Sequence, residues 1–323
     1  MSKGKLKRKI LLNVYSENLA FLIKNEKISD IPFKENNKYV CPICLNHFSE
    51  DDLENTSNNP LTLEDSPPKS LGGSQIVLTC ASCNNTMGRD IDWHLSERLN
   101  ELDFKDRIEG SKQLGRFTLG EMTVNGEIKV HKGGVTKAYY SKNNNHPKLL
   151  EKYIDTISKN RSLSPIFNKK PSRVDPKKLQ IALLKSAYIL MFEKFGYSFL
   201  FNPEYDRIRE QLLNPTKDVY PLKCWFQGPF PKERIGVPFI VEKNLESIFV
   251  LFELKTKLSS RMFAVVLPLS TKPIEDIIIE LEKRFEKEKN FEISMESYDK
   301  TDYLKDIESI NILLTWMSSF EEK

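Results

Sequence analysis

The stretch that decides the fold runs from Leu61 to His94 and reads LTLEDSPPKSLGGSQIVLTCASCNNTMGRDIDWH. It contains a Cys-x-x-Cys pair, Cys80 and Cys83, that repeats an earlier pair at Cys41 and Cys44. Two thiols in one tight turn can reach the same tetrahedral ion, and two such turns complete an all-sulfur shell. The four cysteines therefore predict a structural zinc site. Disulfides and scattered core thiols are the alternatives, but only five cysteines in 323 residues and their paired spacing favour zinc.

Between the two pairs lie 35 residues that predict two strands around a loop rich in proline and glycine. Leu61-Thr-Leu alternates as a strand does and ends in Glu64-Asp65. Pro67 and Pro68 stop the strand, and Gly72-Gly73 permits a tight reversal before a second strand at 76–78. A helix is expected after the second pair, with Asn84 or Asn85 as its cap. Its apolar stripe has spacings of four and three and comprises Met87, Ile91, Leu95, Leu99 and Leu102.

The rest of the chain predicts an α+β protein in three parts. Residues 1–105 hold the cysteines, residues 106–174 carry a β-hairpin and a linker, and residues 175–323 form a separate α+β domain. Asn125-Gly126 is the dipeptide typical of a tight hairpin turn. A helix at 175–195 is apolar nearly all round, as in the centre of a domain. Further strands are expected at 9–14, 238–241, 247–255, 261–267 and 291–295, and helices at 17–27, 147–158, 204–213, 273–287 and 303–317.

Composition indicates an ordinary globular protein with a net charge of +4. Positive charge gathers at the start of the chain, where it suits either a phosphate backbone or a solvated terminus. The residues concerned are Lys3, Lys5, Lys7, Arg8 and Lys9. No apolar run is long enough to span a membrane, and no small-residue cleavage site follows the apolar segment at 10–23. We therefore expect a cytoplasmic protein without a membrane partner.

Glu64 and His94 are the residues best suited to hold a catalytic divalent cation such as Mg2+. Phosphodiester cleavage needs a cation on the phosphate oxygens, a group that deprotonates water and a rigid frame. A carboxylate at a strand end is a hard oxygen ligand, and the imidazole of His94 offers a nitrogen from the following helix. The alternatives are a merely polar strand end at Glu64 and a core or surface histidine beside Trp93.

These features together resemble the HNH endonucleases, a family of ββα-metal (His-Me finger) nucleases. The resemblance covers the N-terminal third of the chain and rests on CPIC, on LTLEDSPPKSLGG, on CASCNN and on the eight residues between Asn85 and His94. It implies a zinc-bound ββα-metal module in which Asn85 pins the loop that carries the catalytic pair and His94 binds the catalytic metal. On a helix with about 100° per residue Asn85 and His94 face opposite sides, which agrees with separate roles.

Asp65 is the position at which this sequence departs from the family pattern. Most members have there the histidine that activates water, whereas an ordinary aspartate has a pKa of about 3.9 and is a poor base at neutral pH. Asp65 is then a catalytic base with a raised pKa, a further metal ligand, or the mark of an inactive site. Lys69 and Arg98 are expected to contact phosphate, although Lys69 suits a solvated loop equally well and the family often has a metal ligand at the position of Arg98.

The sequence therefore predicts an HNH-type endonuclease that hydrolyses phosphodiester bonds with a catalytic Mg2+ or another divalent ion. DNA is the expected substrate, with RNA as the alternative, and bacterial or phage defence or mobile elements are the expected setting. The C-terminal domain is expected to bind a protein partner or a second copy of the chain. The rival interpretation is a catalytically decayed zinc module that binds nucleic acid or protein.

Overall fold

The computed structural model shows a mixed α+β protein and describes residues 2–27, 39–54, 56–160, 162–200, 203–269, 273–287, 293–296 and 302–318. The chain divides into two compact units. Unit 1 comprises Met1–Leu95, Asp175–Leu254 and Arg261–Lys323, and unit 2 comprises Ser96–Val174 and Lys255–Ser260. The helix that the sequence assigns to a separate C-terminal domain thus shares a unit with the four cysteines. Within the described ranges no helix is both long and apolar enough to cross a membrane.

Unit 1 begins with a long helix, α1 (Lys3–Lys24), where the sequence predicted a strand followed by a shorter helix. The prediction of a strand at 9–14 was wrong because a helical stripe continues through it. Buried side chains recur at spacings of three and four at Leu12, Tyr15, Leu19 and Leu22. The hydroxyl of Ser2 accepts a hydrogen bond from the Lys5 amide and caps the helix at its start.

The stretch around the cysteines folds into two hairpins and a helix. Strands β1 (Tyr39–Val40) and β2 (His47–Phe48) pair antiparallel, as do β3 (Leu61–Ser66) and β4 (Ser74–Cys80). The loop between β3 and β4 needs its glycines, since a Cβ on Gly73 would lie 1.5 Å from the carbonyl oxygen of Pro67. The helical run α2 (Ala81–Met87), η3 (Gly88–Asp92) and α3 (Trp93–Lys105) follows directly, with η3 a π-helical turn. Cys80 is its cap, so the predicted cap at Asn84 or Asn85 was wrong.

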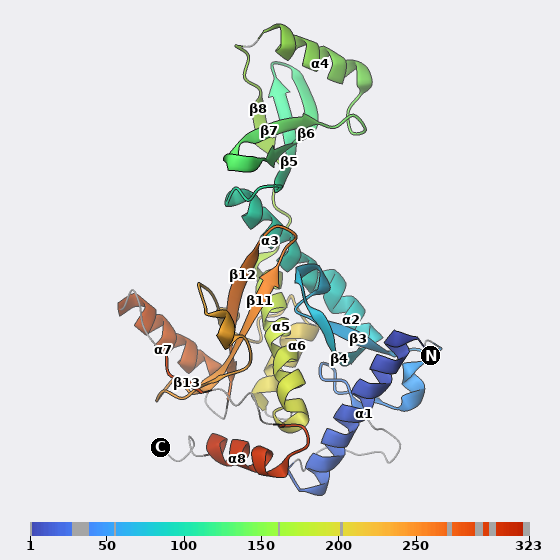
Figure 1. Cartoon of the computed structure of the whole chain (residues 1–323), viewed down its shortest axis with the longest axis vertical. Coiled ribbons are helices and arrows are strands. Elements are labelled where there is room, and N and C mark those ends of the chain that lie inside the picture. Colours follow the sequence, from blue (N-terminus) through green and yellow to red (C-terminus); the bar gives the residue numbers. More distant parts are fainter. Residues whose placement is uncertain are drawn as a thin grey trace. The chain divides into compact units, whose positions relative to one another are not determined.

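Helix α5 (Pro176–Phe195) is buried over most of its length, as its apolar sequence predicted. It contacts β3 and β4 and also β9 (Trp225–Gln227), so it links the cysteine region to a five-stranded sheet (Figure 1). That sheet has the order β13-β10-β11-β12-β9. Its other strands are β10 (Phe239–Ile240), β11 (Ser247–Lys255), β12 (Ser260–Pro268) and β13 (Met295–Glu296). The further helices of unit 1 are α6 (Pro203–Leu213), α7 (Ile274–Lys287) and α8 (Ile307–Ser318). The strand predicted at 291–295 lies partly outside the described residues.

Unit 2 contains the greater part of α3, a four-stranded sheet with the order β7-β6-β5-β8 and helix α4. The elements are β5 (Lys112–Leu119), β6 (Met122–Val130), β7 (Thr136–Tyr140), α4 (Pro147–Lys159) and β8 (Ile166–Lys169). The hairpin turn predicted at Asn125-Gly126 was wrong, because this dipeptide lies inside β6 and the chain turns at Gly120. Gly126 is needed there for close approach, since a Cβ would lie 2.4 Å from the Tyr139 carbonyl oxygen.

Candidate metal centre and acidic cluster

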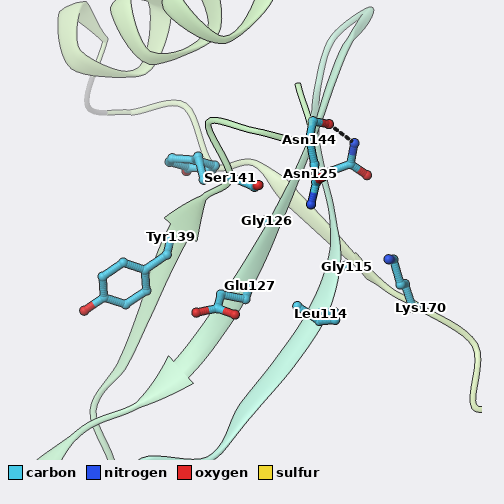
Figure 2. Close-up of a pocket in the computed structure, with 10 residues that line it drawn as sticks. Leu114, Gly115, Asn125, Gly126, Glu127, Tyr139, Ser141, Asn144 and Lys170 are labelled. Carbon is cyan, nitrogen blue, oxygen red and sulfur yellow. Dashed lines mark hydrogen bonds between the residues drawn. The ribbon is translucent and has the colours of Figure 1, made fainter. Parts of the chain in front are cut away.

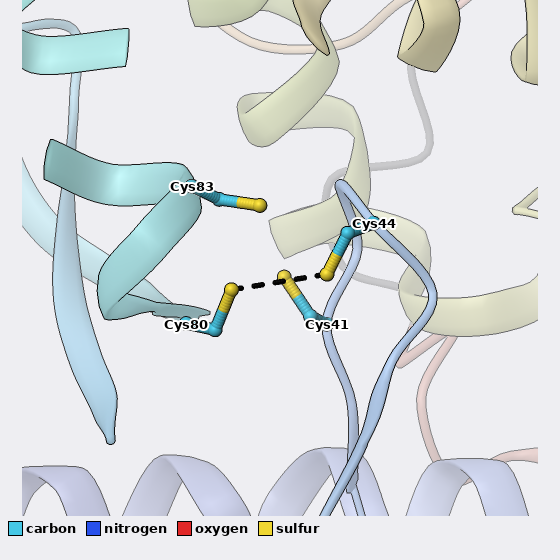
Figure 3. Close-up of side chains that lie close together, drawn as sticks. All are labelled: Cys41, Cys44, Cys80 and Cys83. Carbon is cyan, nitrogen blue, oxygen red and sulfur yellow. Dashed lines mark hydrogen bonds between the residues drawn. The ribbon is translucent and has the colours of Figure 1, made fainter. Parts of the chain in front are cut away.

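The four predicted zinc ligands converge on one point. The sulfur atoms of Cys41, Cys44, Cys80 and Cys83 all lie within 4.8 Å of one another and point into a common space (Figure 3). A tetrahedral ion with bonds of about 2.3 Å to sulfur would hold its ligands about 3.8 Å apart. The distance from Cys44 Sγ to Cys80 Sγ is 3.8 Å. The donor set and its spacing therefore fit a metal such as zinc, and among the described residues this is the only such group of His, Cys, Asp or Glu.

Local backbone structure presents the thiols in pairs. Two backbone hydrogen bonds close the turn of the first pair: the Cys41 amide donates to the Asn46 carbonyl oxygen at 2.9 Å, and the Leu45 amide donates to the Cys41 carbonyl oxygen at 3.0 Å. Leu45 in this turn has a positive φ of 58°. The second pair stands where β4 passes into α2. Burial raises the pKa of the Cys41 thiol, whereas hydrogen bonds from the neighbouring thiols lower the pKa of Cys80. A cation would favour the thiolate form of all four groups.

Three buried tyrosines fix the first cysteine turn in place. Tyr188 on α5 donates its hydroxyl hydrogen to the Pro42 carbonyl oxygen at 2.5 Å. The Tyr197 hydroxyl donates to the Val40 carbonyl oxygen at 2.7 Å and accepts from the Val40 amide at 3.0 Å. Tyr39 donates to the carbonyl oxygen of Leu78 on β4 at 2.6 Å. The backbone that carries the thiols is therefore held by residues that no cysteine motif would reveal.

Glu64, predicted to bind the catalytic cation, forms a buried ion pair instead of lying open. Its side chain is 2% exposed, one carboxylate oxygen lies 2.7 Å from Lys185 Nζ, and the other accepts a hydrogen bond from Thr79 at 3.0 Å. Lys185, also 2% exposed, lies 2.7 Å from an oxygen of Asp92 as well. The ammonium group therefore bridges a carboxylate from β3 and a carboxylate from η3. Neither Lys185 nor Asp92 was predicted from the sequence.

Glu64, Asp65 and Asp92 form an acidic cluster. Its three carboxylates face one buried cation, the ammonium group of Lys185. The strand register shifts at a bulge between Glu64 and Asp65, so both neighbours in sequence stay close to the cluster. Burial raises the pKa of Asp92, and the Asp65 carboxylate adds to that effect while Lys185 opposes it. The second oxygen of Asp92, Oδ1, is buried without a hydrogen-bond partner in the described part of the chain. One carboxylate oxygen thus remains available for a positive ligand.

Burial also raises the pKa of Asp65 itself, and the Lys69, Lys185 and Lys7 ammonium groups partly oppose this. Asp65 is half-buried and Lys69 is exposed. A raised pKa makes the carboxylate a better proton acceptor than an ordinary aspartate. The predicted phosphate contact at Lys69 lies near enough to influence this group, and Lys7 adds charge from the basic start of the chain.

His94 lies two residues beyond Asp92 along the helical run, but its ring is held by another segment. The side chain is buried, and Nδ1 accepts a hydrogen bond from the Asp175 amide at 3.1 Å. Burial lowers the pKa of His94, as does the charge of Lys178, while Asp175 and Asp90 oppose the shift. The imidazole is therefore neutral at pH 7, with its proton on Nε2 according to this hydrogen bond.

The asparagine that ties the helix to β3 is Asn84, the neighbour of the predicted Asn85. Its amide donates to the Thr62 hydroxyl and to the Leu63 carbonyl oxygen, both at 3.0 Å. Asn85 is exposed. Because Leu63 directly precedes Glu64, Asn84 makes the contact near the predicted catalytic pair that the family resemblance led us to expect of Asn85.

Arg98, the other predicted phosphate contact, is exposed and pairs with Glu101 on the same helix at 3.0 Å.

Comparison with protein-family models, with curated proteins and with solved structures found no match. The likeness to HNH endonucleases therefore depends on the motif in this sequence.

Proposed function

We propose that this chain is a zinc-stabilised, HNH-type endonuclease that hydrolyses phosphodiester bonds in DNA with a divalent cation such as Mg2+. The acidic cluster at the end of β3 carries this proposal. Glu64, Asp65 and Asp92 bring three carboxylates together around one buried ammonium group, and Asp92 Oδ1 has no partner in the described chain. Hard cations prefer such oxygen ligands.

The residues divide into three roles in this proposal. Lys185 and Thr79 fix Glu64, so Glu64 shapes the site and adds negative charge. Asp92, whose Oδ1 has no partner among the described residues, is the carboxylate left to hold the cation, which when bound would acidify water and polarise the phosphate. Lys69 and Lys7 lie near enough to Asp65 to lower its pKa and are placed to attract the phosphate backbone.

Asp65 replaces the usual histidine base under this proposal. Its pKa is raised by burial, so its carboxylate is a stronger proton acceptor than that of an exposed aspartate. His94 supports the same helix and would become a ligand only if its ring exchanged the Asp175 amide for the cation.

A second candidate function is a binding module that does not cleave, and Lys185 favours it. Its Nζ lies 2.7 Å from an oxygen of Glu64 and 2.7 Å from an oxygen of Asp92, which is the arrangement a metal cation would otherwise complete. A buried ammonium in that position neutralises part of the cluster without any metal. In this case the ββα-like unit would be a scaffold for binding nucleic acid or protein.

Plasmid nicking by the zinc-loaded full chain tests the proposal, with Mg2+, Mn2+ or Ni2+ added or each omitted. We expect metal-dependent cleavage that Asp65→Asn and Asp92→Asn each reduce by about a hundredfold or more, as for loss of a general base or its cation. Asp90→Asn is the matched control, since this neighbouring aspartate pairs with the exposed Arg89. Circular dichroism and zinc content establish that each variant is folded.

Two results would decide against the nuclease. If both variants cleaved at the wild-type rate, the acidic cluster would not be the site. If no metal supported cleavage by the folded wild-type chain, the binding module would be the better description.

A further inference from the structure

The sheet of unit 2 has one covered face and one open face. Helix α4 packs on the covered face, where Phe117, Val124, Leu150 and Tyr153 form a buried cluster (Figure 1). Side chains alternate between the two faces along a strand, so the residues between these positions point to the open face. They include Leu114 and Arg116 on β5, Glu127 and Lys129 on β6, and Lys137 and Tyr139 on β7.

The open face belongs to the basic part of the chain. Unit 2 contains 18 Lys and Arg but only nine Asp and Glu, a net charge of +9, whereas the whole chain has a net charge of +4. On the open face the basic residues Lys112, Arg116, Lys129 and Lys137 accompany one acid, Glu127, which pairs with Lys112 at 3.1 Å. This excess of positive charge is complementary to a polyanion.

A cavity of about 660 Å³ lies on this face beside an exposed aromatic ring. Polar groups of Asn125, Glu127, Asn144 and Lys170 line it, and Tyr139 forms one side (Figure 2). The Tyr139 side chain is 42% exposed.

A neighbouring histidine contacts the aromatic ring. The Tyr139 ring stacks on His131 with centroids 5.9 Å apart, and the two are joined by a hydrogen bond of 2.8 Å. An exposed aromatic side chain next to polar donors and acceptors is a surface on which a base can stack.

We propose that the open face of the unit 2 sheet binds single-stranded nucleic acid. The phosphates would run along Arg116, Lys129 and Lys137, and one unstacked base would lie against Tyr139 in the cavity. A single strand suits the site better than a duplex, because bases in a duplex are already stacked and cannot cover an aromatic ring. The binding surface itself does not depend on the proposed nuclease function. Only the expectation that the bound strand is the substrate rests on it.

Fluorescence anisotropy of the full chain with a labelled oligothymidylate, without added Mg2+, tests the proposal. The double substitution Arg116→Glu/Lys137→Glu should weaken binding at least about tenfold and lower the slope of log Kd against log salt by about 1.4, since each phosphate contact to a single strand contributes about 0.7. Tyr139→Ala should weaken binding about fivefold or more, and Tyr139→Phe should retain it.

The matched control is Lys148→Glu/Lys152→Glu, which makes the same change of charge at exposed positions of α4. At physiological salt, where the Debye length is about 8 Å, this control should change Kd by less than about twofold. The proposal is overturned if the control weakens binding as much as the open-face variant does. It is also overturned if the oligonucleotide does not bind, or if a DNA duplex or anionic phosphatidylserine vesicles outcompete it.

An oligouridylate of the same length shows whether RNA binds as well, and binding of either strand supports the proposal. The nicking assay and the binding assay test the nuclease proposal and the binding surface independently. Loss of oligonucleotide binding with plasmid nicking intact would reject this surface alone, whereas binding without nicking would reject the nuclease alone.

Discussion

Lys185→Met is the sharpest test of the acidic cluster. At 2.7 Å and an effective dielectric constant of about 20, each of the two ion pairs of Lys185 has a Coulomb attraction of about 6 kcal/mol. Desolvation of the three groups offsets much of this, but removal of the ammonium leaves two carboxylates without their buried counter-charge. We expect the free energy of unfolding at pH 8 to fall by about 3–5 kcal/mol.

The same variant should become relatively more stable as the pH falls. Burial raises the pKa of Glu64 and of Asp92, and Lys185 opposes both shifts, so its loss raises both pKa values further. An acid with a folded-state pKa above its unfolded value stabilises the protein below the unfolded pKa, and this contribution is lost as the pH rises through the folded pKa. The difference from wild type should therefore be smaller at pH 5 than at pH 8.

Urea denaturation followed by circular dichroism measures both effects. Lys177→Met is the matched control on the same helix, since Lys177 pairs with the exposed Asp218 at 2.7 Å and should cost at most about 1 kcal/mol. Adding Glu64→Gln to Lys185→Met should recover part of the loss. The reasoning is refuted if Lys185→Met costs no more than the control at pH 8, or if its deficit grows towards pH 5.

Three further predictions concern the frame of the site. Asn84→Ala should lower the free energy of unfolding by about 1–2 kcal/mol, because the Asn84 amide makes two hydrogen bonds to β3, while Asn85→Ala should stay within about 0.5 kcal/mol; urea denaturation compares them. Cys80→Ser should lose the bound zinc and lower the melting temperature, as measured by metal analysis and circular dichroism, and an unchanged metal content would reject the site. Tyr188→Phe should cost about 1–3 kcal/mol, because the Pro42 carbonyl oxygen loses its buried donor, and a neutral effect in calorimetry would contradict this.

The features that the sequence predicts well are those carried by local spacing. Each Cys-x-x-Cys turn presents its own two thiols, and the four sulfur atoms lie together as predicted. The Pro/Gly loop also agrees with the sequence, since Gly73 leaves no room for a side chain. The apolar helix at 175–195 is also confirmed as α5. In each case the pattern that predicts the feature is local: a Cys-x-x-Cys turn, a Pro/Gly loop or a run of apolar residues.

The features that the sequence misses depend on residues far apart in the chain. The Asn125-Gly126 dipeptide favours a hairpin turn locally, but Asn125 exchanges hydrogen bonds with Asn145, and Gly126 packs against the Tyr139 carbonyl oxygen. Strand pairing with β7 therefore overrides the local preference. Lys185 likewise has no local signal in the sequence, because its partners Glu64 and Asp92 lie far from it in the chain and meet it only in the folded structure.

Helix α5 joins the metal centre to the acidic cluster. Lys185 and Tyr188 are three residues apart and so lie on neighbouring positions of one helix face, one bound to Glu64 and Asp92 and the other to the Pro42 carbonyl oxygen in the first cysteine turn. A shift of the cysteine turn would therefore move the helix that holds the cluster. Under the proposed nuclease function, Cys44→Ser should reduce nicking even though none of the cysteines belongs to the acidic cluster. Nicking at the wild-type rate by a zinc-free, folded Cys44→Ser variant would show that α5 does not couple the two sites.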